Sequence, residues 1–125
     1  MSSKYLLFIV FVLWGFLSQS QFSLDSNGVT IKCPLANVGD TGVVGSTTYV
    51  KVDRATLVAS ITASPNPADV ATCCTSGIED FSDLFRARFS FNQDISHWDT
   101  ASATTMREMF RSAHVFNQNI GDWDV

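Results

Sequence analysis

The residues of this chain whose type and spacing could do chemistry are its aspartates, which are frequent in the C-terminal half. Carboxylates that lie close together are the ligands of a hard cation such as Ca²⁺. However, no D-x-D-x-D-G loop and no glycine-rich nonapeptide surrounds them. We therefore expect solvated or backbone-capping aspartates and neither a metal nor another cofactor, with a calcium-binding ladder as the alternative. The aspartates concerned are Asp80, Asp83, Asp94, Asp99, Asp122 and Asp124.

Two Trp-Asp pairs and a histidine are the next candidates. Trp98 and Trp123 each precede an aspartate, as in a propeller blade, but their 25-residue spacing is too short, since a blade needs about 40 residues. We expect both indoles in the core, with sugar stacking as the alternative. His97 is not repeated, since Asp122 takes its place, and no serine lies in a G-x-S-x-G motif. The sequence predicts no catalytic residue; a small stand-alone enzyme would need hydrolytic activity that is lost on His97→Ala.

The three cysteines are Cys33, Cys73 and Cys74, and an exported protein can form disulfides. Because adjacent cysteines rarely bond each other, Cys33 is expected to pair with either Cys73 or Cys74. The third thiol is then free or intermolecular. No CxxC motif is present, and His97 and His114 have no neighbouring ligand at zinc spacing. We therefore interpret the cysteines as structural.

A repeat occupies the C-terminal part of the chain. Residues 91–100 read FNQDISHWDT and residues 116–125 read FNQNIGDWDV, with six of ten positions identical and a 25-residue offset. A fixed period of this length is typical of stacked units, each of which buries its apolar residues against a neighbour. The positions that we assign to the structure of the repeat are Phe81, Leu84, Phe85, Phe91, Asn92, Ile95, Trp98, Met106, Met109, Phe110, Phe116, Asn117, Ile120 and Trp123.

Each repeat is predicted to contain one helix and one short strand. Apolar residues recur at helical spacing over residues 102–113, where Ser102 could be the cap, and an S-x-x-E capping box begins the preceding copy at Ser76. A turn and a short strand are expected in residues 94–99 and 119–124. These elements indicate an α/β fold class, a leucine-rich-repeat-like solenoid preceded by a small β-rich cap. The apolar positions of the predicted helix are Ala103, Met106, Met109, Phe110 and Ala113.

Two polar positions also recur, Asn92 as Asn117 and Gln93 as Gln118. Amides at equivalent positions of stacked units can hydrogen-bond the backbone of the adjacent turn, which satisfies polar groups that stacking buries. We expect these four amides to do so.

The repeat M-x-x-M-F-x-x-A-x-x-F-N-Q-D-I-x-x-W-D-(V/T) resembles that of the BspA-like leucine-rich-repeat surface proteins. It stands here as Met106, Met109-Phe110, Ala113, Phe116-Asn117-Gln118, Ile120 and Trp123-Asp124, with a half-copy before it. The match covers residues 75–125. The resemblance implies cell-surface exposure with adhesion or protein binding as the role, and it implies no catalytic residues.

Residues 21–72 are predicted to form a small cap of strands and one helix. Val29–Lys32 is β-prone, and Gly45-Ser46 separates two β-branched runs in a predicted hairpin. Asp53 can act as the N-cap of a helix from Arg54 to about Thr62, with Leu57, Val58 and Ile61 on one face and a proline-rich end. A unit this short rarely folds alone, so we expect it to cover the end of the repeats in residues 73–125.

Residues 1–20 resemble a secretory signal peptide in their charge and hydrophobicity. Lys4 supplies the positive charge, Tyr5 to Leu17 is apolar, and Ser18-Gln19-Ser20 offers a cleavage site. The apolar run is short for a membrane span, and an uncleaved anchor is the alternative; we expect no membrane span after cleavage. The formal net charge of the chain is −4, which argues against nucleic acid as the main partner.

The sequence therefore predicts a secreted or cell-surface repeat protein that mediates protein binding or adhesion without catalysis. Its partner would be a protein or a host or surface ligand of unknown identity. The alternative is a non-catalytic carbohydrate-binding or adhesin-associated module of a larger exported enzyme. Since Val125 falls where the next helix should begin, we expect a fragment of a longer array.

Overall fold

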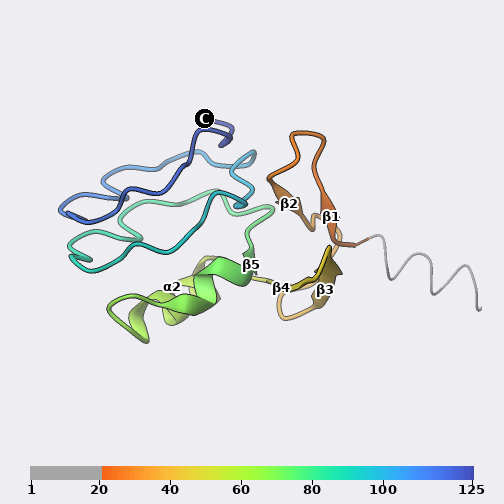
Figure 1. Cartoon of the computed structure of the whole chain (residues 1–125), viewed down its shortest axis with the longest axis horizontal. Coiled ribbons are helices and arrows are strands. Elements are labelled where there is room, and N and C mark those ends of the chain that lie inside the picture. The colour runs from red at the N-terminus through yellow and green to blue at the C-terminus, as the bar shows by residue number, and fades with distance from the viewer. Residues whose placement is uncertain (1–20) are drawn as a thin grey trace, which may run out of the picture.

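The computed structural model describes residues 21–125, so the predicted signal peptide lies outside the described residues. Small sheets from the first part of this region lie beside a stack of irregular coils (Figure 1). Helix α2 (Arg54–Thr62) covers one end of the stack, and the C-terminus lies at the other end. Among the described residues, no helix is long and apolar enough to cross a membrane.

The sheets are short and involve five strands. β1 (Ser23–Leu24) pairs antiparallel with β2 (Ile31–Lys32). In the second sheet β3 (Thr41–Val44) pairs antiparallel with β4 (Thr47–Lys51), and β4 pairs parallel with β5 (Cys73–Cys74). The hairpin predicted around Gly45-Ser46 is confirmed as the β3–β4 connection.

Two glycines make this hairpin possible. Gly45 has a φ of 63°, a backbone conformation that glycine adopts without steric cost and that a two-residue hairpin turn requires. Gly42 lies directly against the ring of Phe22, and a Cβ atom there would collide with that ring. The absence of a side chain at Gly42 thus lets β3 cover Phe22, which is buried.

The prediction of a helix capped by Asp53 is confirmed. The Asp53 carboxylate accepts a hydrogen bond from Thr56 N at 2.8 Å, and Asp53 N donates to Thr56 Oγ1, which completes a capping box. Leu57 and Ile61 are fully buried, whereas Val58 packs half-buried against the same core. A 3-10 helix, η1 (Ala68–Thr72), follows the proline-rich turn and leads into β5.

The helix and strands predicted inside the repeats are wrong. Within residues 75–125 the chain forms no helix or extended strand, but a succession of turns with one isolated bridge between Asp80 and Thr105. The S-x-x-E sequence at Ser76 therefore caps no helix, and neither does Ser102. We call residues 76–100 coil 1 and residues 101–125 coil 2.

The turns differ from a helix in where their N–H groups bond. Alternate N–H groups bond three residues back in the same coil, as Arg86 N does to Asp83 O. The N–H groups between them cross to the next coil, as Phe85 N does to Met109 O at 2.8 Å. In an α-helix every N–H group would bond within its own segment. The helix and the observed turns therefore share the spacing of apolar residues but differ in their hydrogen bonding.

The backbone conformation repeats with the same period as the sequence. Asp83 and Ala87 in coil 1 and their counterparts Glu108 and Ser112 in coil 2 all have φ between 56° and 62°. These left-handed residues recur every four positions and turn the chain so that alternate N–H groups face the neighbouring coil. No α-helix can accommodate them, since each breaks the right-handed backbone path.

Aromatic rings at equivalent positions stack along the coils. Trp98 and Trp123 lie with ring centroids 6.3 Å apart and an interplanar angle of 2°, and Phe91 lies 5.6 Å from Phe116 in the same way. Trp98 and Phe91 are completely buried. The core that these rings build extends to α2 and η1, and its buried members are Val52, Leu57, Ile61, Val70, Cys73, Ile78, Phe81, Leu84, Phe85, Phe91, Ile95, Trp98, Met109 and Trp123.

The predicted bonding of the recurring amides is confirmed for Asn92, Gln93 and Gln118, whereas the Asn117 side chain has no hydrogen-bond partner within the described residues. Asn92 Oδ1 accepts from Asn117 N at 3.0 Å, and Gln118 Nε2 donates to Asn92 O at 3.0 Å. The same contacts link Asn92 and Gln93 to the cap, where Asn66 takes the corresponding place. The amides thus form one ladder that runs from the cap through both coils.

Candidate functional site

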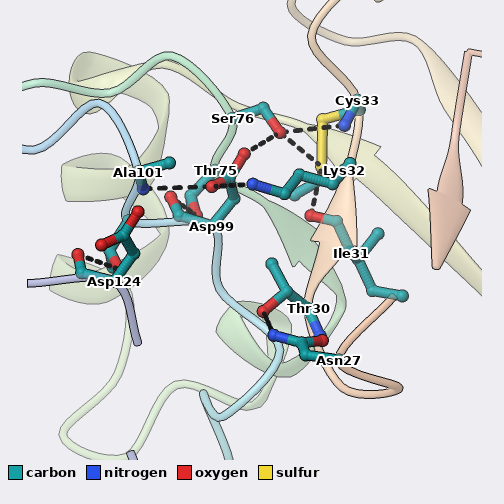
Figure 2. A network of polar contacts seen from close by, with 12 residues as sticks. Asn27, Thr30, Ile31, Lys32, Cys33, Thr75, Ser76, Asp99, Ala101 and Asp124 are labelled. Atoms are coloured by element: carbon teal, nitrogen blue, oxygen red, sulfur yellow. Dashed lines mark hydrogen bonds and ion pairs between the residues drawn. A yellow bond between two sulfur atoms is a disulfide. The ribbon is translucent and has the colours of Figure 1, made fainter. Parts of the chain in front are cut away.

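A buried polar cluster joins the N-terminal strands to coil 1 (Figure 2). The Asp99 carboxylate accepts hydrogen bonds from Ser76 Oγ at 2.6 Å, Lys32 Nζ at 2.9 Å and Ala101 N at 3.1 Å. Burial alone would raise the pKa of Asp99, but the bonds from Ser76 and Lys32 outweigh it and hold that pKa below its usual value. Asp99 is therefore a fixed anion with filled hydrogen-bonding positions, and this arrangement suits an anchor rather than a proton donor.

The disulfide lies in the same cluster and joins Cys33 to Cys74, which decides between the two pairings that the sequence left open. Cys73 is a free, buried thiol. Burial, assisted by the negative charge of Asp69, raises the pKa of Cys73 to about 11. A thiol that stays protonated is a poor nucleophile and metal ligand, so the structural interpretation of the cysteines agrees with the chemistry of this site.

Two further basic side chains, those of Lys51 and His97, are buried at this junction. Lys51 Nζ donates to Cys33 O and Ser76 O, and desolvation lowers its pKa although Asp99 opposes the effect. His97 Nε2 lies 2.9 Å from Cys73 O, and burial lowers the pKa of its imidazole. Because Nε2 faces a carbonyl oxygen, it carries the proton in the neutral ring. Backbone carbonyls thus hold both side chains in place.

The end of the stack next to the cap is closed by Arg54. Its Nη1 donates to Asp80 O at 2.7 Å and its Nη2 donates to Ser82 O at 2.9 Å. The equivalent carbonyls of coil 2, one repeat period later, are Thr105 O and Arg107 O, which accept N–H groups from coil 1. The guanidinium therefore supplies the two donors that a preceding coil would otherwise provide.

The opposite end of the stack carries backbone donors that are free within the described residues. These donors are the N–H groups of Met106, Glu108, Phe110 and Ser112, and none of them has an acceptor in residues 21–125. They stand one repeat period after the coil 1 N–H groups that donate to coil 2. We call this side of coil 2 the open face. A hollow of about 250 Å³ beside it is lined by Ala103, Thr104, Thr105, Met106 and Val125.

The outer surface of the coils presents side chains in rows that match the 25-residue period. Phe89 is 58% exposed, and its ring stacks on the exposed His114 with centroids 5.5 Å apart. We call Phe89, His114 and the exposed Val115 the outer ridge. A second row consists of charges, in which Glu108 pairs with Arg86 at 3.2 Å and with Arg111 at 2.9 Å. Such rows present chemically similar groups at the spacing of the coils.

The structure does not bring the predicted aspartates together. Among residues 21–125, no group of three His, Cys, Asp or Glu side chains is arranged to hold a metal ion. Asp80 and Asp94 each bind the hydroxyl and N–H of a serine two residues later. These bonds lower the pKa of each carboxyl, and they are the backbone-capping contacts expected from the sequence.

The two repeat tryptophans are core residues, as predicted. Trp98 is fully buried and Trp123 is 7% exposed, so neither ring face is open to a sugar. Each indole N–H donates to a carbonyl of the preceding unit, Trp98 to Val70 O at 3.0 Å and Trp123 to Ile95 O at 3.1 Å.

Sequence reasoning missed that the cap contains a degenerate copy of the repeat. Val70 stands one repeat period before Ile95, and both carbonyls accept a tryptophan N–H. Thr75 and Thr100, separated by the same period, donate from their hydroxyls to Asp99 O and Asp124 O. The common pattern D-(I/V)-x-x-x-x-T in residues 69–75 and 94–100 is the signal that could have identified it.

Comparison with known proteins places the repeats in a family. No curated protein and no solved structure matches the chain significantly. A family model described as "Mycoplasma protein of unknown function, DUF285" matches residues 55–125, which begin in α2 and include both coils. The matched region covers more than half of the chain, and it includes every interaction between the coils described above. The chain therefore belongs to DUF285, a family of surface-protein repeats.

Proposed function

We propose that this chain is a secreted or cell-surface repeat protein that binds another protein, or mediates adhesion, and has no catalytic activity of its own. The observation that carries the proposal is the outer ridge, where Phe89 and His114 stack in register on the outside of adjacent coils. Aromatic residues, Phe among them, are enriched at protein–protein interfaces relative to the rest of the surface. Membership of a family of surface-protein repeats supports the proposed location.

We further propose that the repeats belong to the BspA-like type and that the stacked coils form a solenoid. The motif residues support this assignment, because Asn92, Trp98 and their copies make the contacts between units. The unit is built of turns here, in place of the strand and helix of an ordinary leucine-rich repeat. In a solenoid each unit contacts only its neighbours, and the contacts of Trp123 and Asn117 with coil 1 fit that description.

Binding to arrays of immobilised extracellular-matrix proteins and glycans tests the proposal. We expect the labelled chain to bind at least one protein, and the variant Phe89→Ser/His114→Ser to lose at least tenfold in apparent affinity. Val43→Ser is the matched control, because Val43 is 64% exposed on β3, away from the coils. In parallel, antibodies should label intact cells that produce the chain.

Two results would contradict the proposal. Binding to glycans alone, with proteins ignored, would favour the carbohydrate-binding alternative. Protein binding that the ridge variant and the Val43→Ser control retain equally would exclude the outer ridge as the binding surface.

A further inference from the structure

A cavity of about 390 Å³ lies between the cap and coil 1. Residues 38 and 51–54 line it from the cap, and residues 76–80 line it from coil 1. Its volume lies within the range of small-molecule sites, about 300–1,000 Å³. Both walls belong to the described residues, so the cavity is a feature of this junction and does not depend on where the stack ends.

Lys51 is a buried cation in the wall of this cavity. It is only 9% exposed, and within the described residues no carboxylate oxygen lies within 4.0 Å of its Nζ. Lysine is almost never buried without a paired charge, because taking an ammonium out of water is costly. Nζ donates to Cys33 O and Ser76 O, which uses two of its three N–H groups. The cavity wall therefore offers one free donor and an uncompensated positive charge.

Two backbone N–H groups in the coil 1 wall, those of Glu79 and Asp80, also lack an acceptor within the described residues. One repeat period later, Thr104 N and Thr105 N both donate to Glu79 O, at 2.7 and 3.4 Å. By this equivalence the N–H groups of Glu79 and Asp80 are directed towards the cap. The corresponding carbonyl there belongs to Arg54, at the start of α2, and is used within the helix. An oxygen atom of a ligand in the cavity can take the place of that carbonyl.

The acidic side chains of the cavity wall do not supply the missing negative charge. The Asp53 carboxylate accepts from Thr56 N and Thr56 Oγ1, and the Asp80 carboxylate accepts from Ser82 N and Ser82 Oγ. Glu79 is exposed at the rim, and its charge repels a ligand that carries several negative charges more than one that carries a single charge. The cavity therefore favours a small monoanion over a phosphate.

We propose that this cavity binds a carboxylate group, which accepts hydrogen bonds from Lys51 Nζ and from the N–H groups of Glu79 and Asp80. The two oxygens of a carboxylate offer about four acceptor positions, which is enough for these three donors, and hydrogen bonds between charged groups are the stronger ones. The apolar side chains of Val38 and Ile78 line the cavity beside them. The carboxylate belongs either to a free small acid or to the C-terminus of a peptide. The site is distinct from the outer ridge and does not rest on the proposed function.

NMR titration of the isotope-labelled chain tests the proposal with two carboxylates. N-acetylglycine represents a free small acid, and acetyl-trialanine with a free C-terminus represents a peptide. We expect both to cause saturable shifts of the amide signals of Gly77, Glu79 and Asp80 at millimolar concentration. The corresponding C-terminal amides and inorganic phosphate should bind at least tenfold more weakly. The acid with the lower dissociation constant identifies the source of the carboxylate.

Two substitutions test the site from different sides. Lys51→Met removes the ammonium but keeps an apolar stem, and should weaken binding of both acids at least tenfold. Val38→Glu places a competing carboxylate at the cavity and should cause a similar loss. Because Val38 is 48% exposed, the fold should tolerate this change, so the test stays decisive even if Lys51→Met does not fold. Val43→Glu adds the same charge at a residue that is 64% exposed on β3, outside the cavity, and should leave binding unchanged.

The proposal is overturned if neither acid causes saturable shifts at these amides, or if Val38→Glu binds the acids as tightly as Val43→Glu does. Equal binding of the C-terminal amides would also overturn it, because the site would then recognise a neutral group, and so would tighter binding of inorganic phosphate. The ridge variant Phe89→Ser/His114→Ser should bind both acids normally, so failure of this inference and failure of the proposed function are distinguishable.

Discussion

Arg54→Ala should destabilise the stack at its closed end. Each of the two hydrogen bonds from the guanidinium, 2.7 and 2.9 Å long, involves a charged donor and has a net value of about 1.5–3 kcal/mol. The side chain is 37% exposed, so water can partly replace the donors. Two such bonds sum to about 3–6 kcal/mol, and reducing that sum by roughly a third for replacement by water gives an expected loss of about 2–4 kcal/mol in the free energy of unfolding.

Other effects of the substitution are small. Arg54 is the first residue of α2, and alanine has a slightly better helix propensity than arginine. The ion pair of Arg54 with Asp80 is exposed and 3.4 Å long, and pairs of this kind contribute little. The loss therefore reports mainly the two capped carbonyls.

Urea unfolding followed by the fluorescence of Trp98 and Trp123 measures this loss. A domain of this size has an m-value of about 1–1.5 kcal/mol/M, so the midpoint should fall by about 2 M. Arg54→Lys should lose about half as much, since an ammonium cannot reproduce the fork that bridges two carbonyls. Arg107 is exposed and its guanidinium makes no hydrogen bond or ion pair within the described residues, so Arg107→Ala should change stability by less than about 0.5 kcal/mol. A midpoint for Arg54→Ala equal to that of Arg107→Ala would refute the reasoning.

Three further predictions concern the anchors and the ladder. Replacing Cys33 and Cys74 together by serine opens a loop of 41 residues, and loop-closure entropy predicts a loss of about 4 kcal/mol in the free energy of unfolding, measured by heat or urea. A reductant should cause the same loss in the parent chain and no further loss in the variant. Because burial depresses the pKa of His97, the unfolded state binds more protons just below pH 6.5 and stability should fall as the pH falls through that range; His97→Gln should abolish this dependence in pH-resolved unfolding. Asn92→Ala removes an acceptor of two bonds and should cost about 1–2 kcal/mol, whereas Asn117→Ala, tested in the same melts, should be nearly neutral.

Local sequence rules predicted the cap well. The Asp53 cap, the bounds of α2 and the Gly45-Ser46 hairpin all follow from short-range chemistry that each segment contains within itself. The amide ladder was also predicted, because a fixed repeat period requires that equivalent polar groups meet. In these cases the residues that determine the structure are close in sequence or recur at a fixed offset.

The turns of the repeats could not be predicted in the same way. Apolar residues at positions such as Met106, Met109 and Phe110 fit one face of a helix and fit the observed turns equally well. The difference lies in whether alternate N–H groups bond within the segment or across to a neighbour, and this depends on a coil that lies a full repeat away in the sequence. Glu108 and Ser112 adopt a left-handed backbone, although neither is a glycine or an asparagine, the residues from which this conformation is usually predicted. Hydrogen bonds to the neighbouring coil impose it instead.

The choice of Cys74 as the partner of Cys33 and the role of Arg54 were also beyond local patterns. Cys74 lies one repeat period before Asp99, so the two residues occupy equivalent places in successive units. In the degenerate copy, Cys74 occupies the repeat position of Asp99, and Cys73 occupies the repeat position of the buried Trp98. The pairing then follows from the repeat, because Trp98 points into the core and Asp99 points to the strands.

Cys74, Asp99 and Asp124 occupy the same position in successive units, and we call them the column. The contacts of the column explain how the cap and the stack hold together. Cys74 is bonded to Cys33, and in the next unit Asp99 is bonded to Lys32, the neighbour of Cys33 in sequence. One short segment of the N-terminal part is thus tied to two successive units, once covalently and once by a partly buried ion pair. Asp124, the third member of the column, is exposed and has no such tie within the described residues. Within the described residues coil 2 is therefore held by coil 1, whereas coil 1 is held from both the cap and the strands.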